Sequence, residues 1–332
     1  MNSELMYTNV KSKEIKITYA IPTYKRSQYI IDTIESIINQ NVLIDDYEIL
    51  IVNNDPSSDM SYLIDKYRKY PISVYRNKEN IGMANNLNRC FQLAVGKYVS
   101  MIHDDDMLCP NFNTEIDDLL NEDYDVIIAK RFNLYNDNKR ALRSQIKYYL
   151  FKWFSWDQLR VEFSEGDSFY AVMNIFLGPT CGTTFNKERF IDAGLFDLSY
   201  PYAFDFYTFQ NLVCKGYKFT TTKDFVGIYR MEVSASNRSE VSLDFFDCNY
   251  DLLQKTKKES RDEDLVRYLK EYEKEILYLK YSRNDNETKR IIRNKYNTDF
   301  NCSKFKYLFL SIKRSIYYYK HRLNFETVYK KK

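Results

Sequence analysis

The chain has 332 residues, 44% of them hydrophobic and 29% charged, so it can bury one large core or two ordinary ones. A formal net charge of only +3 argues against a generally basic nucleic-acid binder, and no nucleic-acid partner is expected. The two histidines exclude multi-histidine metal sites. With eight glycines, the chain also lacks both common glycine-rich phosphate-binding motifs.

Cysteine spacing and hydropathy indicate where the protein is located. The six cysteines form no C-x-x-C pair, which is typical of reduced thiols in the cytosol. Residues 1–16 lack the apolar core of a secretory signal, and no stretch approaches the length of a membrane span. We therefore expect a cytoplasmic protein.

Strands and helices alternate over the first part of the chain. Apolar, β-branched runs predict strands at 15–22, 47–53, 72–75, 98–102 and 125–131. Apolar residues at helical spacing predict helices at 28–40, 58–69 and 83–94. This alternation predicts an α/β fold with a mostly parallel sheet flanked by helices.

Polar clusters follow three of these strands, at 23–26, 53–55 and 103–106. Ligands of parallel sheets bind outside the carboxyl ends of the strands, so we expect the three clusters to converge on one crevice.

The rest of the chain divides by composition. Residues 141–170 are rich in aromatic side chains, which indicates a core or lid segment, or a platform for stacking sugars. Residues 244–300 are charged and helical in period. Residues 304–332 hold nine Lys or Arg against one Glu, interleaved with Phe and Tyr. We expect this basic aromatic tail to contact an anionic membrane surface; a solvated helical pair and a nucleic-acid contact are the alternatives.

The triple aspartate Asp104-Asp105-Asp106 is the strongest chemical signal. Adjacent carboxylates repel one another unless a cation lies between them, and such oxygen ligands suit Mg²⁺ or Mn²⁺. The alternative is a solvated acidic loop that caps the next helix. His103 adjoins the cluster, and we expect it to support a carboxylate rather than bind the metal.

Asp205 is the second candidate. It lies among Phe204, Phe206 and Tyr207, and apolar surroundings raise a carboxyl pKa into the range of a general base. The alternative is an aspartate that caps a helix or sits in its first turn.

Short motifs follow one another in order over roughly the first 235 residues. They are Pro22-Thr23-Tyr24-Lys25-Arg26, the run Glu48 to Asp55, Asn80-Ile81-Gly82 with Asn88, the run His103 to Pro110, Gly194-Leu195-Phe196-Asp197, and Tyr229-Arg230. Each motif is weak alone, but the ordered set resembles glycosyltransferase family 2, whose members have the GT-A fold.

The resemblance implies an inverting transferase that moves a sugar from a nucleotide donor, most simply a UDP-sugar, to a carbohydrate or lipid-linked acceptor. It implies a role in bacterial surface polysaccharide synthesis, with the enzyme cytoplasmic or peripheral on the inner membrane face. The implied domains are a GT-A domain over 1–240, with a nucleotide half at 15–110 and an acceptor half at 111–240. A helical region covers 241–332.

The resemblance also implies roles for particular residues. The residues implied to contact the nucleotide-sugar are Pro22, Thr23, Tyr24, Arg26, Asn53, Asp55, Asn88 and Asp104. Mn²⁺ or Mg²⁺ would be held mainly by Asp105, with Asp104, Asp106 and Glu232 as further ligands. Asp205 would be the base that deprotonates the acceptor.

Two other functions stay open at this point. A sugar-nucleotide pyrophosphorylase would need a glycine-rich loop that residues 20–30 lack. A non-catalytic carbohydrate-binding or scaffolding protein is favoured by His103, Phe204 and Glu232, which depart from the family's usual residues.

Overall fold

The computed structural model describes residues 3–11, 14–25, 27–41, 46–135, 162–163, 180–231 and 239–259, and isolated positions (267, 270, 290–291, 293–295, 305, 309 and 312). Arg26, Glu232 and nearly all of the 141–170 segment therefore lie outside the described residues. The chain splits into two compact units. The first is Met1–Ser199 with Phe204–Ser234, and the second is Tyr200–Ala203 with Ala235–Lys332. The boundary at residue 240 stays a prediction.

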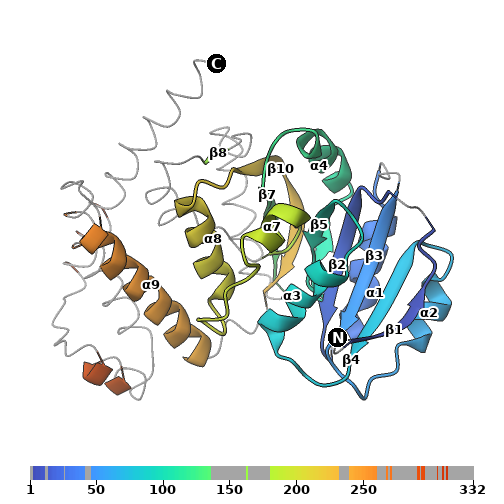
Figure 1. Ribbon diagram of the computed structural model, residues 1–332, viewed down its shortest axis with the longest axis horizontal. Helices are drawn as coiled ribbons and strands as arrows, with labels where there is room; N and C mark the ends of the chain where they lie inside the picture. Colours follow the sequence, from blue (N-terminus) through green and yellow to red (C-terminus); the bar gives the residue numbers. More distant parts are fainter. Residues whose placement is uncertain are drawn as a thin grey trace. The chain divides into compact units, whose positions relative to one another are not determined.

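The first unit is built on a sheet in which strands β2 to β5 are parallel (Figure 1). Strands β2 (Ile17–Thr23), β3 (Tyr47–Asn53), β4 (Ile72–Asn77) and β5 (Tyr98–Met101) run parallel in the order β4-β3-β2-β5. Helices α1 (Ser27–Ile38), α2 (Ser61–Tyr67) and α3 (Met83–Leu93) connect them. The predicted α/β fold is confirmed.

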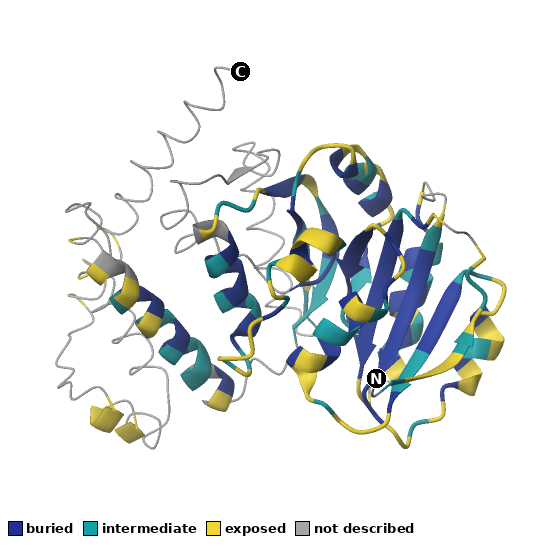
Figure 2. Ribbon diagram, viewed as in Figure 1, coloured by how far each residue is buried: buried dark blue, intermediate teal, exposed yellow. Residues whose placement is uncertain are grey.

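The parallel strands are buried on both faces, which explains why their sequences are continuously apolar (Figure 2). One face carries side chains such as Ile17, Ile49 and Ile51, which pack in one core with residues of α1, α2 and α4 (Phe112–Leu120). The opposite face receives Leu87 and Phe91 from α3. The carboxyl ends of β2 and β3 are level, because Thr23 pairs in register with Asn53.

Antiparallel pairs extend the sheet on both sides. Beyond β5 come β9 (Thr183–Asn186), β7 (Val126–Leu134), β10 (Phe219–Arg230) and β6 (Met107–Leu108), while β8 (Glu162–Phe163) also pairs with β10. β9 is antiparallel to both of its neighbours, and β7 and β10 are parallel to each other. At the other edge, β1 (Ser3–Thr8) is antiparallel to β4.

Phenylalanine rings fill the core beside β9. Phe91, Phe185, Phe190, Phe196 and Phe209 are all buried and make ring contacts with centroids 4.6–6.3 Å apart. They bring together α3, α7 (Lys187–Asp192) and α8 (Phe204–Cys214). Part of the chain's aromatic content, which is 17% of its residues, therefore lies in the core.

The second unit contains α9 (Ser239–Glu259). The Asp244 carboxylate of α9 accepts hydrogen bonds from the main-chain N–H groups of Tyr202 and Ala203, both 2.7 Å, and Asp251 accepts one from the Tyr200 hydroxyl. These bonds explain why residues 200–203 group with α9. Across the described residues of both units, no helix has the length and apolarity that crossing a bilayer requires.

Candidate active site

The acidic turn, residues 103–106, follows directly from β5 at the carboxyl end of the parallel strands. Asp104 and Asp105 are each 5% exposed and Asp106 is fully buried, so this is no solvated loop. The Asp106 N–H donates to the carbonyl of His103 at 3.1 Å, which closes the turn. The hydroxyl of Thr33 on α1 donates to the Asp106 carbonyl at 2.7 Å.

Arg230, the last residue of β10, fastens the same turn from the other side. Its main-chain N–H donates to Asp106 Oδ1 and its Nε to the Asp105 carbonyl, each at 3.0 Å. The guanidinium also lies 4.6 Å from the Tyr29 ring centroid and pairs with Asp32 at 3.4 Å. Two distant segments, α1 and β10, thus hold Asp105 and Asp106 in place.

Asp106 retains an unsatisfied oxygen. Oδ2 is buried and accepts no hydrogen bond of ordinary geometry from the part of the chain that the structure describes, although the Cys181 thiol is near enough to interact with the carboxyl. Burial, and then the neighbouring charge of Asp105, raises the pKa of Asp106 to about 8. A buried, orphaned carboxylate oxygen beside a second carboxylate is an electrostatic environment that a cation would relieve.

These residues fit a divalent cation of the Mg²⁺ or Mn²⁺ type. Among the described residues, no three His, Cys, Asp or Glu side chains gather closely enough to enclose a metal. Mg²⁺ characteristically takes only one or two protein carboxylates and completes its coordination with water and phosphate oxygens. The acidic turn suits that mode, and the predicted ligand Glu232 lies outside the described residues.

Thr23 joins the segment Pro22-Thr23-Tyr24-Lys25 to the acidic turn. Its hydroxyl donates to Asp104 Oδ2 at 2.7 Å, and the Tyr24 N–H approaches the same oxygen at 3.4 Å. Pro22 is buried within β2, whereas the Tyr24 side chain is 41% exposed just beyond the strand. Lys25 follows with a left-handed φ of 59°, so the chain turns sharply at this point.

Asn53 and Asp55 form a second turn beside Thr23. Asn53 accepts from the Asp55 N–H at 2.9 Å and donates to the Asp55 carbonyl at 3.2 Å. The hydroxyl and N–H of Ser57 donate to the Asp55 carboxylate and, with Lys25 nearby, hold its pKa below the ordinary value. Asp55 is therefore an ionised acceptor at neutral pH.

Asn54, which the sequence analysis did not single out, anchors the loop after β4. Its Oδ1 accepts from Asn77 and from the Ile81 N–H, and its Nδ2 donates to Asn80 and Gly82. The two adjacent asparagines of Asn53-Asn54-Asp55 are the sequence signal that could have indicated this role.

Asp205 lies in the first turn of α8, within the same unit as the acidic turn. Its Oδ1 accepts the N–H of Phe206 at 2.7 Å. Although the residue keeps some exposed surface, desolvation raises the pKa of its carboxyl to about 6. The first-turn position and the raised pKa, which the sequence presented as alternatives, are both found.

Arg131 lies near both Asp106 and Asp205, and the sequence did not predict this role for it. Its guanidinium lies 5.3 Å from the Tyr229 ring centroid, and its Nε is buried with no partner among the described residues. Its charge opposes the raised pKa of both Asp106 and Asp205, so one cation acts on both carboxyls. An arginine at the end of the apolar run 125–131 was the available signal.

The remaining predicted residues have structural partners. His103 pairs through Nε2 with the Thr180 hydroxyl, and the support of a carboxylate expected for it stays a prediction. Asn88 does not join the turns at the strand ends: both of its side-chain amide atoms bond the main chain of Phe196.

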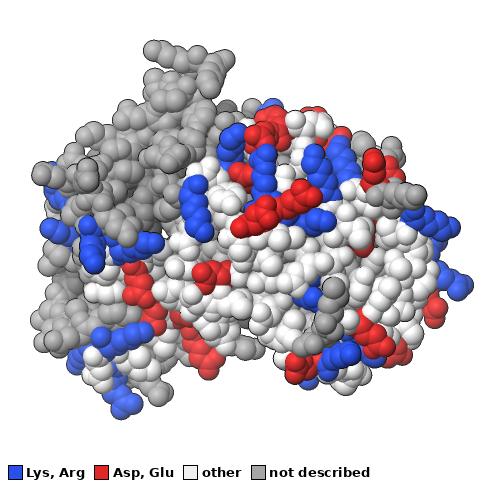
Figure 3. Space-filling view, viewed as in Figure 1, with Lys and Arg blue, Asp and Glu red and all other residues white. Residues whose placement is uncertain are grey.

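Charged side chains of both signs intermingle on the described part of the face shown in Figure 3.

Comparison with known proteins agrees with this architecture. Residues 18–177 match the family model of glycosyl transferase family 2. The abequosyltransferase RfbV of Salmonella typhimurium is 28% identical over 145 residues, which cover 41% of this chain and 44% of that protein. The minor teichoic acid biosynthesis protein GgaB of Bacillus subtilis is 30% identical over 102 residues, 30% of this chain and 11% of that protein. The chain thus spans less than half of either relative.

Two solved structures share the fold. S. aureus TarS 1–349 in complex with UDP has a TM-score of 0.55 at 14% identity, covering 83% of this chain and 77% of that one. The mannosyltransferase PcManGT from Pyrobaculum calidifontis, in complex with GDP-Man and Mn²⁺, has a TM-score of 0.52 at 14% identity, covering 93% and 88%. Residues 18–177 therefore match glycosyltransferase family 2, and the chain shares the GT-A fold, as its motifs indicated.

Proposed function

We propose that this protein is an inverting, metal-dependent glycosyltransferase. It transfers a sugar from a nucleotide donor to a hydroxyl of a carbohydrate or lipid-linked acceptor. The proposed donor is a UDP-sugar. The observation that carries the proposal is the pairing of a rigid acidic turn with a separate carboxyl of raised pKa, Asp205, in one unit. With a divalent cation bound, the acidic turn suits a diphosphate leaving group. The Asp205 carboxyl suits a general base.

The donor site is proposed at the carboxyl ends of β2, β3 and β5. Tyr24 and Arg26 would face the nucleobase, and the turn from Asn53 to Asp55 would take base or ribose. Asp104, already oriented by Thr23, would reach the ribose or the cation. When bound at Asp105 and its neighbours, Mg²⁺ or Mn²⁺ would offset the charge that develops on the departing diphosphate.

Asp205 is proposed to deprotonate the acceptor. A carboxyl with a pKa of about 6 is mostly ionised at neutral pH, yet it is more basic than an ordinary aspartate. Asp205 takes the proton as the acceptor oxygen bonds to the anomeric carbon and the bond to the diphosphate breaks. Attack on the side opposite the leaving group inverts the anomeric centre.

The names of the relatives suggest the biological setting. One is a minor teichoic acid biosynthesis protein and another an abequosyltransferase, which supports a role in assembling a bacterial surface polysaccharide. The donors bound in the TarS and PcManGT structures are UDP-GlcNAc and GDP-Man, so nucleotide-sugars of both bases are candidates. Acceptors of this type lie at the inner membrane face.

The basic aromatic tail is proposed to hold the enzyme at that face. Of its residues, Phe305, Phe309 and Ile312 are described, helical, and 85%, 59% and 50% exposed. Their spacing places them on one side of a helix, next to nine basic side chains in the sequence. Removing residues 304–332 should weaken binding to anionic vesicles but not to neutral ones. Unchanged binding would contradict membrane contact.

Thermal denaturation tests donor binding directly. UDP should raise the melting temperature in Mn²⁺ and should raise it far less in EDTA, with GDP and ADP as matched nucleotides. No shift with any nucleoside diphosphate would count against the proposal. Slow hydrolysis of a nucleotide-sugar without acceptor would distinguish an enzyme from a non-catalytic protein of the same fold. Release of pyrophosphate from a nucleoside triphosphate would indicate a pyrophosphorylase instead.

A further inference from the structure

The segment Gly194–Asp197 is fastened to α3 by one side chain. Asn88 donates from Nδ2 to the Phe196 carbonyl and accepts the Phe196 N–H at Oδ1, both at 2.9 Å. An amide that pairs with both polar groups of one residue fixes that residue's position and orientation. The two residues lie 108 positions apart in the sequence.

The next residue fastens the same segment to α8. The Asp197 N–H donates to the Thr208 hydroxyl at 2.8 Å. Thr208 is 3% exposed and lies three residues after Asp205, which is about one helical turn. The segment therefore connects α3 to the part of α8 that carries the proposed base.

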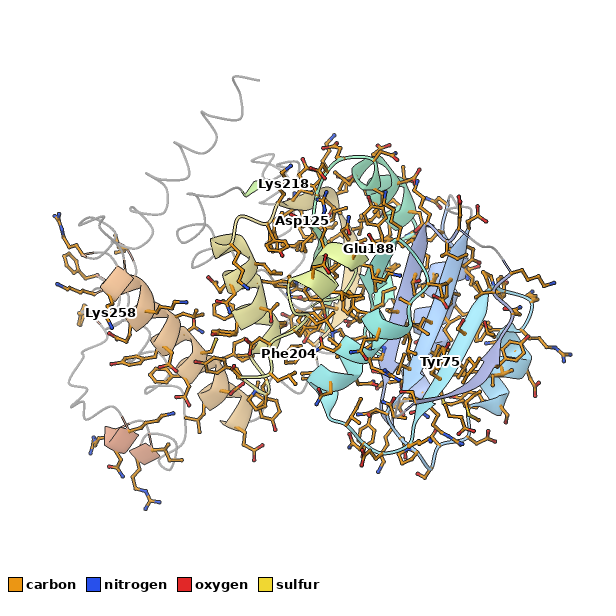
Figure 4. All side chains as sticks on the ribbon, in the orientation of Figure 1. Tyr75, Asp125, Glu188, Phe204, Lys218 and Lys258 are labelled. Atoms are coloured by element: carbon orange, nitrogen blue, oxygen red, sulfur yellow. The ribbon has the colours of Figure 1, made fainter. Side chains whose placement is uncertain are left out.

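The Phe196 ring makes contacts on both sides of Asp205. It is 1% exposed, and its centroid lies 5.4 Å from that of Phe204 and 6.3 Å from that of Phe209. Phe204, labelled in Figure 4 at the beginning of α8, immediately precedes Asp205, and Phe209 follows it by four residues. A displacement of Phe196 would disturb the first turn of α8 through both rings.

The backbone of this segment is not a relaxed loop. Gly194 has a φ of +103° and Leu195 a φ of +64°, a left-handed conformation that is uncommon for a residue with a side chain. N–H groups of Gly194 and Leu195 bond back to Ile191 and Phe190. Such a conformation persists only where its surroundings hold it, and Asn88 and Thr208 are part of those surroundings.

We infer that Asn88 and Thr208 are positioning residues that hold Asp205, through Phe196 and Asp197, in line for proton transfer. The inference rests on the proposed function of Asp205. It gives the G-L-F-D motif a purpose and moves Asn88 from the nucleotide contact expected from sequence to the acceptor side of the reaction. A base must lie within hydrogen-bond reach of its proton, so a small shift of α8 lowers turnover without altering donor binding.

Asn88→Asp tests the first link, since it keeps the size but replaces the donating amide by a carboxylate facing the Phe196 carbonyl. We expect kcat to fall by about ten-fold or more, with the donor KM and the Kd for UDP unchanged. Asn85→Asp is the matched control, because Asn85 is exposed on the same helix and its side chain donates to the Ile81 carbonyl one turn away. It should leave kcat, the donor KM and the Kd for UDP unchanged.

Thr208 supplies a rescue experiment. Thr208→Val removes the hydroxyl at constant size and should lower kcat, whereas Thr208→Ser keeps the acceptor for Asp197 and should restore most of it. A variant of Asn88 that raises the donor KM or the Kd for UDP at unchanged kcat would overturn the inference, as would equal activity of the two Thr208 variants. If the wild-type protein itself turns over no donor, the proposed function fails instead.

Discussion

The hydroxyl of Thr23 donates a 2.7 Å hydrogen bond to the carboxylate of Asp104 and so links the ends of two adjacent parallel strands. Thr23 is 5% exposed, as is Asp104, so the bond is shielded from water. It fixes the first carboxylate of the acidic turn against the end of β2. The proposed donor site and the acidic turn are therefore joined by a direct side-chain contact.

Thr23→Val should weaken donor binding. The variant keeps the shape of the side chain and removes the 2.7 Å hydrogen bond to Asp104. A bond to a charged group contributes about 1.5–3 kcal/mol, so we expect the Kd for UDP in Mn²⁺ to rise by roughly ten- to one hundred-fold. Isothermal titration measures it. Thr23→Ser should bind within a few-fold of wild type; equal binding by the valine variant would show that the bond is irrelevant to the donor.

Asp205→Asn should abolish transfer and preserve donor binding. General base catalysis contributes about 10²–10⁴-fold, so we expect kcat to fall by that amount while the Kd for UDP is unchanged. Coupled detection of released nucleoside diphosphate gives the rate. Asp59→Asn, an exposed surface substitution, serves as the control. A fully active asparagine variant would remove Asp205 from the mechanism.

The pH profile follows from the raised pKa of Asp205. A base acts when deprotonated, so kcat/KM should be level above pH of about 6 and fall about ten-fold per pH unit below it. An unperturbed aspartate would place this limb near its ordinary pKa of 3.8. Stopped assays between about pH 4.5 and 8 would locate the acidic limb of kcat/KM. A value of kcat/KM that stays level down to about pH 4.5 would contradict burial as the cause.

Asp106→Asn should stabilise the metal-free protein at neutral and higher pH. The folded pKa of about 8 lies above the ordinary 3.8, so the neutral form is favoured, and its stabilising contribution is lost as pH rises through 8. The gain in melting temperature of the variant in EDTA should grow between about pH 4 and 8 and then level off. A constant difference across this range would contradict the assignment.

Gly96→Ala should destabilise the fold for a steric reason. An added Cβ would lie 2.6 Å from the main-chain nitrogen of Thr18 and 2.8 Å from the carbonyl carbon of Ile17, so β2 would have to move. Overpacking of this kind typically lowers the free energy of unfolding by about 1–3 kcal/mol, measurable in urea. The exposed neighbour Val95, changed to Ala, should alter it by less than about 0.5 kcal/mol.

The parallel half of the sheet could be predicted because strands that are buried on both faces have uninterrupted apolar sequences. β3 begins and ends where its run does, at Tyr47 and Asn53. β9 could not be predicted in the same way, since four residues, Thr183–Asn186, carry too little pattern and its antiparallel pairing depends on β5 and β7. β1 is an edge strand with mostly exposed side chains, so it lacks an apolar run.

The acidic turn was predictable because its three carboxylates are adjacent in sequence. Arg131 was not, because its effect depends on Asp106 and Asp205, which approach it only in the fold. The pairing of Asn88 with Phe196 has the same origin: no local pattern indicates a contact between residues so far apart. Local chemistry can be read from sequence, whereas the contacts that orient it require the structure.

Turnover of a nucleotide-sugar is the most direct test of the proposed activity. The wild-type protein and Asp205→Asn would be given a panel of UDP-, GDP- and dTDP-sugars with Mn²⁺, with and without a mixture of saccharide acceptors, and the released nucleoside diphosphate measured. We predict release from one donor that increases with acceptor, stops in EDTA, and is lost in the variant. Release that is absent for every donor, or equal in the two proteins, would contradict the account.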